Sequence, residues 1–156
     1  MQGARALVDV LVESGIEHVF GLPGDTGMAL YDAFNERRDR IEHIMTRDER
    51  SASFMADAYA RASGRIGVCE GPSGGGATYI LPGVAEAQGS AIPMLCMTSD
   101  TPVAQHQRGV LTELDQESLF RPVTKWNTRI NSSATMAEMT RRAIRMATVG
   151  RPGAVH

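Results

Sequence analysis

The sequence predicts an α/β protein of three layers (α/β/α), in which helices cover both faces of a mainly parallel sheet of about six strands. Three observations support this prediction. Short, continuous apolar runs alternate along the chain with longer segments whose apolar residues recur at helical spacing. Glycine or proline turns separate the two kinds of segment. The chain has 156 residues, which is the size of one domain with a real core, so we expect a single domain over residues 1–156.

The first half of the chain alternates helix and strand regularly. Apolar residues between Leu7 and Val12 recur at helical spacing and stop before Gly15, which indicates a helix closed by a glycine cap. The run HVFG is short and apolar and leads into a turn, as expected of a buried strand. By the same reasoning we expect helices over 4–14, from Met28 to Phe34 and over 48–63, and strands over 18–21 and 41–45.

The second half continues this alternation around an irregular middle. Residues 101–122 show no regular pattern beyond one short helix. Ser132 and Ser133 precede a periodic segment and are expected to cap its helix. After Gly150, the segment RPGAVH predicts a turn into one more buried strand, from which we expect a domain cut from a longer protein. The remaining predictions are strands over 65–70, 92–100 and 123–130 and helices over 76–89 and 134–149.

Composition excludes several classes of partner. Lys and Arg total 16 against 18 Asp and Glu, and no basic stretch is present, so we expect neither a nucleic acid nor a membrane partner. No apolar run reaches the about eighteen residues that a membrane span needs, and no signal peptide pattern opens the chain, so a cytoplasmic protein is expected. Cys69 and Cys96 each lie within an apolar run, which predicts reduced packing residues and no disulfide or metal pair.

A glycine-rich turn, GPSGGGAT at residues 71–78, lies between a predicted strand and a predicted helix. Free backbone amides at the start of a helix invite a phosphate. The dinucleotide fingerprint fails because Tyr79 stands where its third glycine belongs, and no Gly-Lys-Ser or Gly-Lys-Thr follows for a P-loop. Two interpretations remain open: a close approach of backbone to a flat ligand or a partner chain, and a tight turn that needs glycine dihedrals.

Glu49 stands at the start of the predicted helix 48–63, and it has two interpretations. Thr46 and Glu49 match a capping box, in which the hydroxyl and the carboxylate satisfy free amides at the start of a helix. The helix behind Glu49 is rich in alanine, which lets another backbone approach and would bury the carboxylate at an interface, where it could hold or pass a proton. These alanines are Ala52, Ala56, Ala58, Ala60 and Ala62.

Asp25 follows Pro23 and Gly24 in the turn that ends the strand 18–21. Active sites of parallel sheets gather at the carboxyl ends of strands, so Asp25, Glu49 and the 71–78 turn could face one cleft. Asp is also an ordinary turn or cap residue, and without a partner this structural interpretation of Asp25 is favoured.

Six segments taken in order resemble the N-terminal, pyrimidine-binding domain of thiamine diphosphate enzymes of the acetolactate synthase type. They are VFGLPGD, RDERSASFMADAYARASGRIGVC, the glycine turn, PMLCMTSD, FRPVTKWN and GRPGAVH, and together they cover essentially the whole chain. The resemblance implies that residues 1–156 form one pyrimidine-binding domain with the thiamine diphosphate-binding fold.

The resemblance also assigns a role to Glu49. In that family, the glutamate at this position hydrogen-bonds N1′ of the cofactor's aminopyrimidine and favours the imino tautomer, whose 4′-nitrogen removes the proton from C2 of the thiazolium. The protein then supplies orientation and one carboxyl group, while thiamine diphosphate is the electron sink. The resemblance thus implies Glu49 as the catalytic residue and the following cofactor-binding residues: Pro23, Gly24, Asp25, Glu49, Ser73, Gly74 and Gly75.

Other parts of the site lie outside this chain according to the resemblance. The family holds the diphosphate and Mg²⁺ on a C-terminal domain with a Gly-Asp-Gly motif, and it carries a central domain between the two. No Gly-Asp-Gly motif occurs here, so we expect no metal ligands in this chain and no activity of the chain alone. Family members assemble as dimers or tetramers, which implies a homo-oligomer through the face of the helix that carries Glu49 and a site completed by the diphosphate-binding domain of another subunit.

The leading hypothesis is the pyrimidine-binding domain of a thiamine diphosphate-dependent 2-oxo acid carboligase or lyase, a transferase or lyase acting on a small 2-oxo acid. Two alternatives remain. One is a separate subunit of a two-subunit decarboxylase of the sulfopyruvate or phosphonopyruvate type. The other is a non-catalytic binding or assembly module that has the same fold. The sequence leaves the donor and acceptor substrates open.

Overall fold

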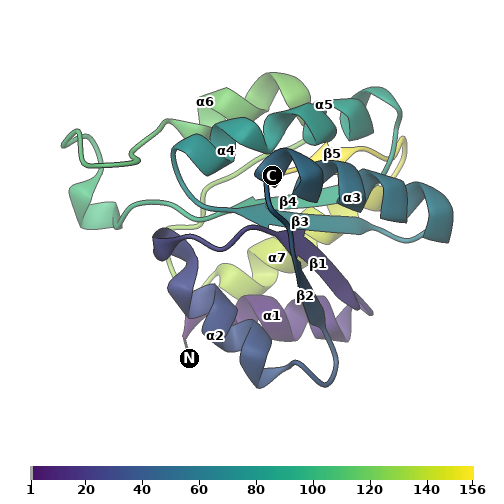
Figure 1. Ribbon diagram of the computed structural model, residues 1–156, viewed down its shortest axis with the longest axis horizontal. Helices are drawn as coiled ribbons and strands as arrows, with labels where there is room; N and C mark the ends of the chain where they lie inside the picture. Colours follow the sequence, from purple (N-terminus) through teal and green to yellow (C-terminus); the bar gives the residue numbers. More distant parts are fainter. Residues whose placement is uncertain (1) are drawn as a thin grey trace.

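The computed structural model describes residues 2–156 and consists of a central sheet with helices on both faces (Figure 1). All neighbouring strands are parallel, and their order across the sheet is β2-β1-β3-β4-β5. This confirms the predicted three-layer α/β fold. The strands are β1 (His18–Gly21), β2 (Glu42–Met45), β3 (Gly67–Gly71), β4 (Met94–Thr98) and β5 (Ala154–Val155).

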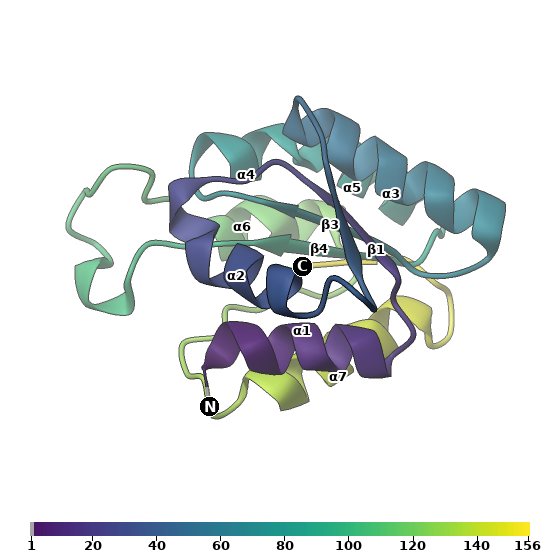
Figure 2. The ribbon, with the colours of Figure 1, turned by 60° about the horizontal axis from the view of Figure 1, so that its bottom comes forward.

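The helices divide between the two faces of the sheet. Figure 2 shows α1 and α7 on one side of the strands and α3, α4 and α5 on the other. None of the helices within residues 2–156 is long and apolar enough to cross a lipid bilayer. The α-helices are α1 (Gly3–Glu13), α2 (Met28–Glu36), α3 (Glu49–Ser63), α4 (Gly75–Tyr79), α5 (Leu81–Gly89), α6 (Gln116–Phe120) and α7 (Met136–Thr148), and the 3₁₀ turns are η1 (Asp25–Gly27), η2 (Val103–Gln105) and η3 (Arg121–Val123).

Two apolar clusters hold the layers together, one on each face of the sheet. The cluster under α1, α2 and α7 is built from medium and large side chains such as Leu11, Phe34 and Val155. The cluster under α3 and α5 contains many alanines. Burial of both clusters supplies the main free energy of folding, because apolar side chains leave water on both faces of the strands.

The small residues of α3 serve packing inside the chain. Ala52, Ala56 and Ala60 are buried, whereas the alanines at positions 58 and 62 are exposed. A Cβ on Gly67 of β3 would collide with the carbonyl oxygen of Ala56, so α3 lies directly on the sheet. The close approach that these alanines predict is thus made in large part to the chain's own backbone.

The prediction of a strand over residues 123–130 is wrong. Trp126 makes only an isolated parallel bridge with Val155. The NH of Lys125 donates to the carbonyl oxygen of Ala154 at 2.8 Å, and the NH of His156 donates to that of Trp126 at 3.0 Å. The NH of Thr128 likewise donates to the carbonyl oxygen of His156 at 3.0 Å, so the segment runs beside β5 without forming a strand of its own. The sheet has five strands, close to the six expected.

Two predicted helices have different limits in the structure. The helix expected over 76–89 is divided into α4 and α5 at Ile80, because Pro82 has no NH to continue the hydrogen-bond ladder of α4. The helix expected from residue 134 begins at Met136. Ser132 does not cap it, since its hydroxyl accepts from the NH of Ala134 within the preceding turn.

The two cysteines are buried and form no disulfide, which confirms their role as packing residues. Burial also raises the pKa of the Cys96 thiol well above its usual value. A thiol in this state is inert as a nucleophile or metal ligand.

Candidate functional site

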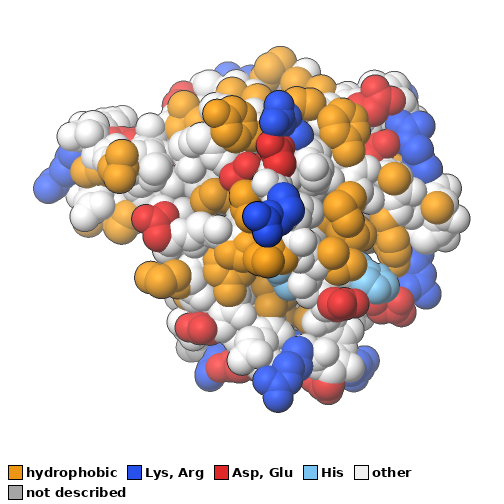
Figure 3. Space-filling view, in the orientation of Figure 1, with side chains coloured by type: hydrophobic (Ala, Val, Ile, Leu, Met, Phe, Trp, Pro, Cys, Tyr) orange, Lys and Arg blue, Asp and Glu red, His pale blue; other side chains and the backbone are white. Residues whose placement is uncertain are grey.

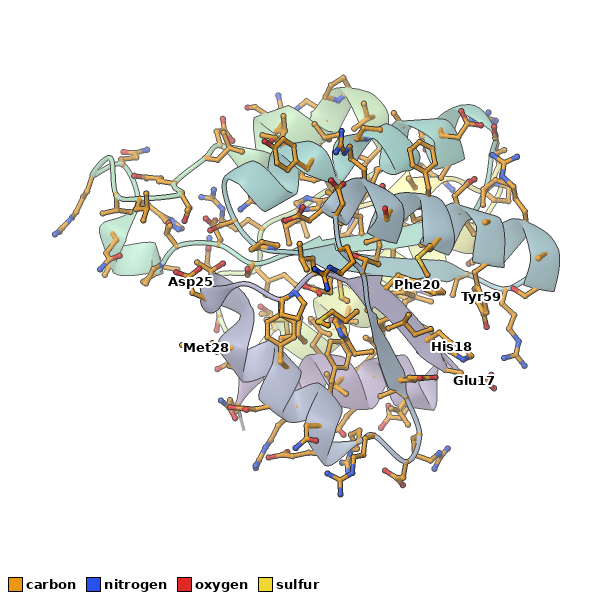
Figure 4. The ribbon with its side chains drawn as sticks, in the orientation of Figure 1. Glu17, His18, Phe20, Asp25, Met28 and Tyr59 are labelled. Carbon is orange, nitrogen blue, oxygen red and sulfur yellow. The ribbon has the colours of Figure 1, made fainter. Side chains whose placement is uncertain are left out.

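The sheet has a topological switch point between β1 and β3. These neighbouring strands lead into helices on opposite faces, β1 into α2 and β3 into α4. Sheets with this strand order bind their ligands at the carboxyl ends of the strands beside the switch point. Figure 4 shows Asp25 and Met28 at this end of β1, and Glu17 and His18 at the other end. The site is therefore expected where the turn 22–27 meets the turn 72–75.

The structure brings these two predicted turns into contact. A Cβ on Gly24 would collide with the ring of Pro72, so the first turn lies against the second without space between them. A Cβ on Gly76 would lie 2.5 Å from the ring of Pro72 on its other side. Glycine at positions 24 and 76 is thus required for close packing around this proline.

Hydroxyl groups join the loops that follow three strands. The NH of Ser73 donates to Oγ1 of Thr26 at 3.2 Å, and the same Oγ1 lies 2.7 Å from Oγ of Ser99. Oγ of Ser73 donates to Oγ1 of Thr112 at 2.7 Å. Thr26, Ser99 and Thr112 were not identified from the sequence, because an isolated Ser or Thr in a loop carries no distinguishing signal. Together they fix the turns that carry the predicted site.

The glycine turn confirms the interpretation of a tight turn that needs glycine dihedrals, while a close approach to a ligand or a partner chain stays a prediction. Gly74 has φ of +65°, and a Cβ there would lie 2.8 Å from Cβ of Thr112, so this position needs glycine for a tight turn. Gly76 instead permits a close approach, because a Cβ there would lie 3.0 Å from Oε1 of Glu49. Gly75 is exposed, and a Cβ there would meet no atom within 4 Å.

The predicted capping box at the start of α3 is wrong. Asp48 is the N-cap, and its Oδ1 accepts from the NH of Arg50 at 2.8 Å. Thr46 instead donates its hydroxyl proton to the carbonyl oxygens of Gly21 and Asp48, at 3.2 and 3.0 Å. The hydrogen bond from the Arg50 side chain lowers the pKa of Asp48 to about 2, so the cap stays ionised. Glu49 is left as the first helical residue and is free of any capping role.

Glu49 is nearly buried, with 8% of its surface exposed. Its side chain lies against the backbone of Gly71 and Gly76, where the missing Cβ atoms leave room for it. Within residues 2–156, no donor makes a hydrogen bond to its carboxylate. Neither oxygen of this carboxylate is among the fully buried, unpartnered side-chain atoms of these residues, so the small exposed part of Glu49 includes its carboxylate. The arrangement therefore offers an unpaired acceptor at the surface beside the glycine turn, which suits a ligand that donates a hydrogen bond or exchanges a proton.

Pro23 and Asp25 have no hydrogen bond or ion pair with Glu49. Both residues are exposed at the rim of the site, and Oδ1 of Asp25 accepts only the NH of Thr26 next to it, at 2.9 Å. Asp25 thus behaves as the turn residue that the structural interpretation favoured. Among residues 2–156, no group of three or more His, Cys, Asp and Glu side chains is placed to hold a metal ion.

Glu70 is a polar residue near the site that the sequence did not identify as functional. It lies on β3 directly before the glycine turn and is 1% exposed. A signal was available, because an acidic residue interrupts the otherwise apolar run GVCEG. A buried carboxylate of this kind needs partners within the protein.

Comparison with known proteins places this geometry in a family. The sequence profile described as "Thiamine pyrophosphate enzyme, N-terminal TPP binding domain" matches residues 1–119. Relatives include the probable acetolactate synthase large subunits of Methanococcus aeolicus, 39% identical, and Methanocaldococcus jannaschii, 38% identical, each over 156 residues and 100% of this chain. The acetolactate synthase isozyme 1 large subunit of Escherichia coli K12 is 34% identical over 153 residues, or 98% of this chain.

The chain spans about a quarter of the length of these curated relatives, 26% of the two archaeal proteins and 27% of the bacterial one. The chain belongs to the thiamine pyrophosphate enzyme family and carries the N-terminal TPP-binding domain of its acetolactate synthase-like members.

Proposed function

We propose that this chain is the pyrimidine-binding domain of a thiamine diphosphate- and Mg²⁺-dependent 2-oxo acid carboligase or lyase, in which Glu49 acts on the cofactor's aminopyrimidine. The family and the names of the relatives support the cofactor and the reaction class. The single observation that carries the role of Glu49 is that its carboxylate accepts no hydrogen bond from residues 2–156 and reaches the surface at the carboxyl edge of the sheet, although the rest of the residue is buried. Such a carboxylate is matched to a partner that comes from outside the domain.

The residues present fit a flat heteroaromatic ring. Gly71 and Gly76 are buried and make room for the Glu49 side chain itself, which places the carboxylate at the surface beside the turn 72–75, where a ring would meet it. When bound, thiamine diphosphate supplies an electron sink for reaction at the carbonyl carbon of a 2-oxo acid.

The chain's own residues have three tasks in this proposal. Glu49 accepts a hydrogen bond from the ring and holds or returns a proton at its carboxylate. Asp48 fixes the first turn of α3 and thereby the direction of the Glu49 side chain. The turn of Pro23, Gly24 and Asp25 and the turn 73–75 flank the ring and exclude water from it.

We further propose that a second copy of the chain covers the face that carries α3. Figure 3 shows this face, on which hydrophobic side chains surround a central group of charged side chains. The exposed apolar residues near Glu49 are Met45, Phe54, Met55 and Tyr79. An exposed apolar patch of this kind is typical of an interface. The diphosphate-binding domain of another subunit, with its Mg²⁺, would then complete the site across this interface.

The test is turnover of 2-oxo acids by the complete enzyme, with its diphosphate-binding domain present. We expect wild-type enzyme to consume a small 2-oxo acid such as pyruvate only when thiamine diphosphate and Mg²⁺ are both added. Glu49→Gln keeps the size of the side chain but changes its acid–base chemistry, and it should reduce turnover at least about a hundredfold. Glu42→Gln is the matched control, because Glu42 is exposed at the start of β2.

Two outcomes would contradict the proposal. An enzyme that binds thiamine diphosphate but turns over no 2-oxo acid would be a binding or assembly module. Activity that appears only after a separately encoded chain with the Gly-Asp-Gly motif is added would indicate the two-subunit decarboxylase, and the substrate would then be sought among sulfonated and phosphonated 2-oxo acids.

A further inference from the structure

Glu70 places a carboxylate inside the layer between the sheet and α2. Its strand, β3, pairs with β1, and Gly21 is its direct neighbour across the ladder. A Cβ on Gly21 would collide with Oε1 of Glu70, so the carboxylate extends across β1 in the space that this glycine leaves. The side chain thereby reaches past the neighbouring strand β1 to Tyr31 on α2 and His43 on β2.

Two side chains satisfy the Glu70 carboxylate. The hydroxyl of Tyr31 donates to Oε2 at 2.9 Å. Nε2 of His43 lies 2.8 Å from Oε1, and since a carboxylate only accepts, this nitrogen carries the proton. The aromatic rings of Tyr31 and Phe34 pack against the His43 ring, with centroids 5.6 and 5.4 Å away. The carboxylate is therefore held in one place by partners that are themselves fixed by packing.

The hydrogen bond from Tyr31 to Glu70 determines the direction of the hydrogen bond between Tyr31 and Gly24. Tyr31 has a single hydroxyl proton, which it donates to Glu70, so its oxygen is left to accept. It accepts from the NH of Gly24 at 3.2 Å. Burial of Tyr31, together with the negative charge of Glu70, raises the pKa of this phenol, so it stays protonated.

Tyr31 lies directly beneath the turn 22–27. A Cβ on Gly27 would lie 2.7 Å from the Tyr31 hydroxyl, and Gly24 packs on its other side against Pro72. The backbone of this turn is thus held from one side by the Tyr31 hydroxyl and from the other by the glycine turn. Moving the hydroxyl would move the turn that carries Pro23, Gly24 and Asp25.

We propose that Glu70 is a positioning residue for the cofactor ring: acting through the Tyr31 hydroxyl, it fixes the backbone of the turn 22–27. The part of this inference that concerns the cofactor rests on the proposed function, whereas the path from Glu70 through Tyr31 to Gly24 rests on the hydrogen bonds alone. Glu70 touches neither the cofactor nor Glu49 in this account.

The experiment uses the complete enzyme and the variants Tyr31→Phe, Glu70→Leu and the double variant. Tyr59→Phe is the matched control, because it removes a phenol near the opposite end of β1, as Figure 4 shows. The first readout is the rate of amide hydrogen exchange at Gly24 without cofactor. The second is the dissociation constant of thiamine diphosphate in the presence of Mg²⁺, and the third is the exchange rate of the C2 proton at saturating cofactor.

Loss of one hydrogen bond should speed exchange at Gly24 about tenfold in Tyr31→Phe and weaken cofactor binding about tenfold, while Tyr59→Phe stays within about twofold of wild type. Glu70→Leu should have the same effect, and the double variant should add nothing, because both residues act along one path. Glu70→Gln keeps an acceptor for Tyr31 and should restore exchange at Gly24 to within about threefold of wild type. At saturating cofactor, C2 exchange should stay within about twofold of wild type in Tyr31→Phe, since Tyr31 does not contact the reacting atoms in this account.

An amide exchange rate at Gly24 that is unchanged in Tyr31→Phe would overturn the inference. This variant keeps the shape of the side chain, so it tests the inference even if Glu70→Leu does not fold. Additive effects, about a hundredfold in the double variant, would also overturn it, because they mean two independent paths. A wild-type enzyme that binds no thiamine diphosphate would overturn the proposed function and the cofactor part of the inference. Faster exchange at Gly24 in Tyr31→Phe would still support the path from Glu70 to the turn in that case.

Discussion

Two glutamates near the carboxyl edge of the sheet are both buried, but only one of them is paired within the domain. Glu70, on β3, is 1% exposed and accepts hydrogen bonds from Tyr31 and His43. Glu49, at the start of α3, is 8% exposed and accepts none from residues 2–156. The exposed fraction of the residue therefore does not distinguish the two carboxylates, whereas internal partners do, and the role proposed for Glu49 depends on this difference.

Each glutamate also depends on a glycine in a neighbouring element. Gly21 leaves the space in which the Glu70 carboxylate crosses β1, and Gly76 leaves the space beside Oε1 of Glu49. The first space is closed by Tyr31 and His43. The second lies at the switch point, where a ligand is expected. In both regions a glycine makes room for a carboxylate, but only the Glu70 carboxylate is enclosed by partners from the domain.

The largest effect should be the difference in the free energy of unfolding between the variants Glu70→Ala and Glu49→Ala. Glu70→Ala leaves the Tyr31 hydroxyl and the His43 NH without an acceptor and opens a cavity, which should lower the free energy of unfolding by about 3 kcal/mol. Glu49→Ala removes no hydrogen bond made within the domain and should lower it by less than about 1 kcal/mol. Urea denaturation of both variants measures this difference, and equal losses would break the distinction between the two glutamates.

Gly76→Ala should impair the Glu49 region more than the fold. The new Cβ would lie 2.5 Å from the Pro72 ring and 3.0 Å from Oε1 of Glu49. Overpacking of this kind costs about 1–3 kcal/mol, and we expect thiamine diphosphate to bind about tenfold more weakly. Calorimetric titration of the complete enzyme measures the affinity. The control is Gly89→Ala, because a Cβ there meets nothing within 4 Å. If Gly89→Ala bound thiamine diphosphate as weakly as Gly76→Ala, crowding around Glu49 would not be the cause.

Phe54→Asp should weaken association of the enzyme without unfolding the domain. Phe54 is 47% exposed on α3, so its replacement disturbs no internal core, but a charge there opposes burial against a second copy. Sedimentation should show at least about a tenfold weaker self-association in this variant. Val149→Asp is the control, since Val149 is exposed at the end of α7. Unchanged association of Phe54→Asp would exclude the α3 face as the interface.

The smallest effect concerns acidic pH and the loop 107–113. The carboxylate of Glu113 accepts backbone NH groups of Gln107, Gly109 and Val110, and these bonds lower its pKa from the ordinary value of 4.5. A pKa that is lower in the folded state means that Glu113 stabilises the loop above pH 4.5 and that this contribution is lost as the pH falls through the lowered pKa.

Amide exchange in this loop, corrected for the intrinsic effect of pH, should therefore speed up below pH 4.5 in wild type. Glu113→Gln should show the faster exchange already at neutral pH and little further change on acidification. A loop that stays equally protected in acid would contradict this role of Glu113.

Local patterns predicted most of the fold because local chemistry decides it. The glycine cap at Gly15, with φ of +75°, and the order of strands and helices follow from spacing and turn residues within a few positions. The break between α4 and α5 was readable from Pro82 by the same kind of rule. The cap of α3 was placed two residues too early, because Thr46 and Glu49 match the capping-box spacing, whereas Asp48, the better N-cap residue type, is the cap in the structure.

Features that depend on distant residues were out of reach of the sequence. Trp126 resembles a strand residue, but its one bridge is to Val155, which lies 29 positions along the chain. Ser73 is joined to Thr26 and Thr112, which are 47 and 39 positions away, and no local pattern marks such a network. Glu49 was identified as the catalytic residue through the family resemblance, and that role stays a prediction.

The most direct test of the account is the rate at which deuterium replaces the C2 proton of thiamine diphosphate bound to the complete enzyme, measured by proton NMR after acid quench. We predict that Glu49→Gln slows this exchange at least about a hundredfold while the cofactor remains bound, because the carboxylate that assists removal of the proton is lost. Exchange at the wild-type rate in Glu49→Gln with cofactor bound would contradict the central claim.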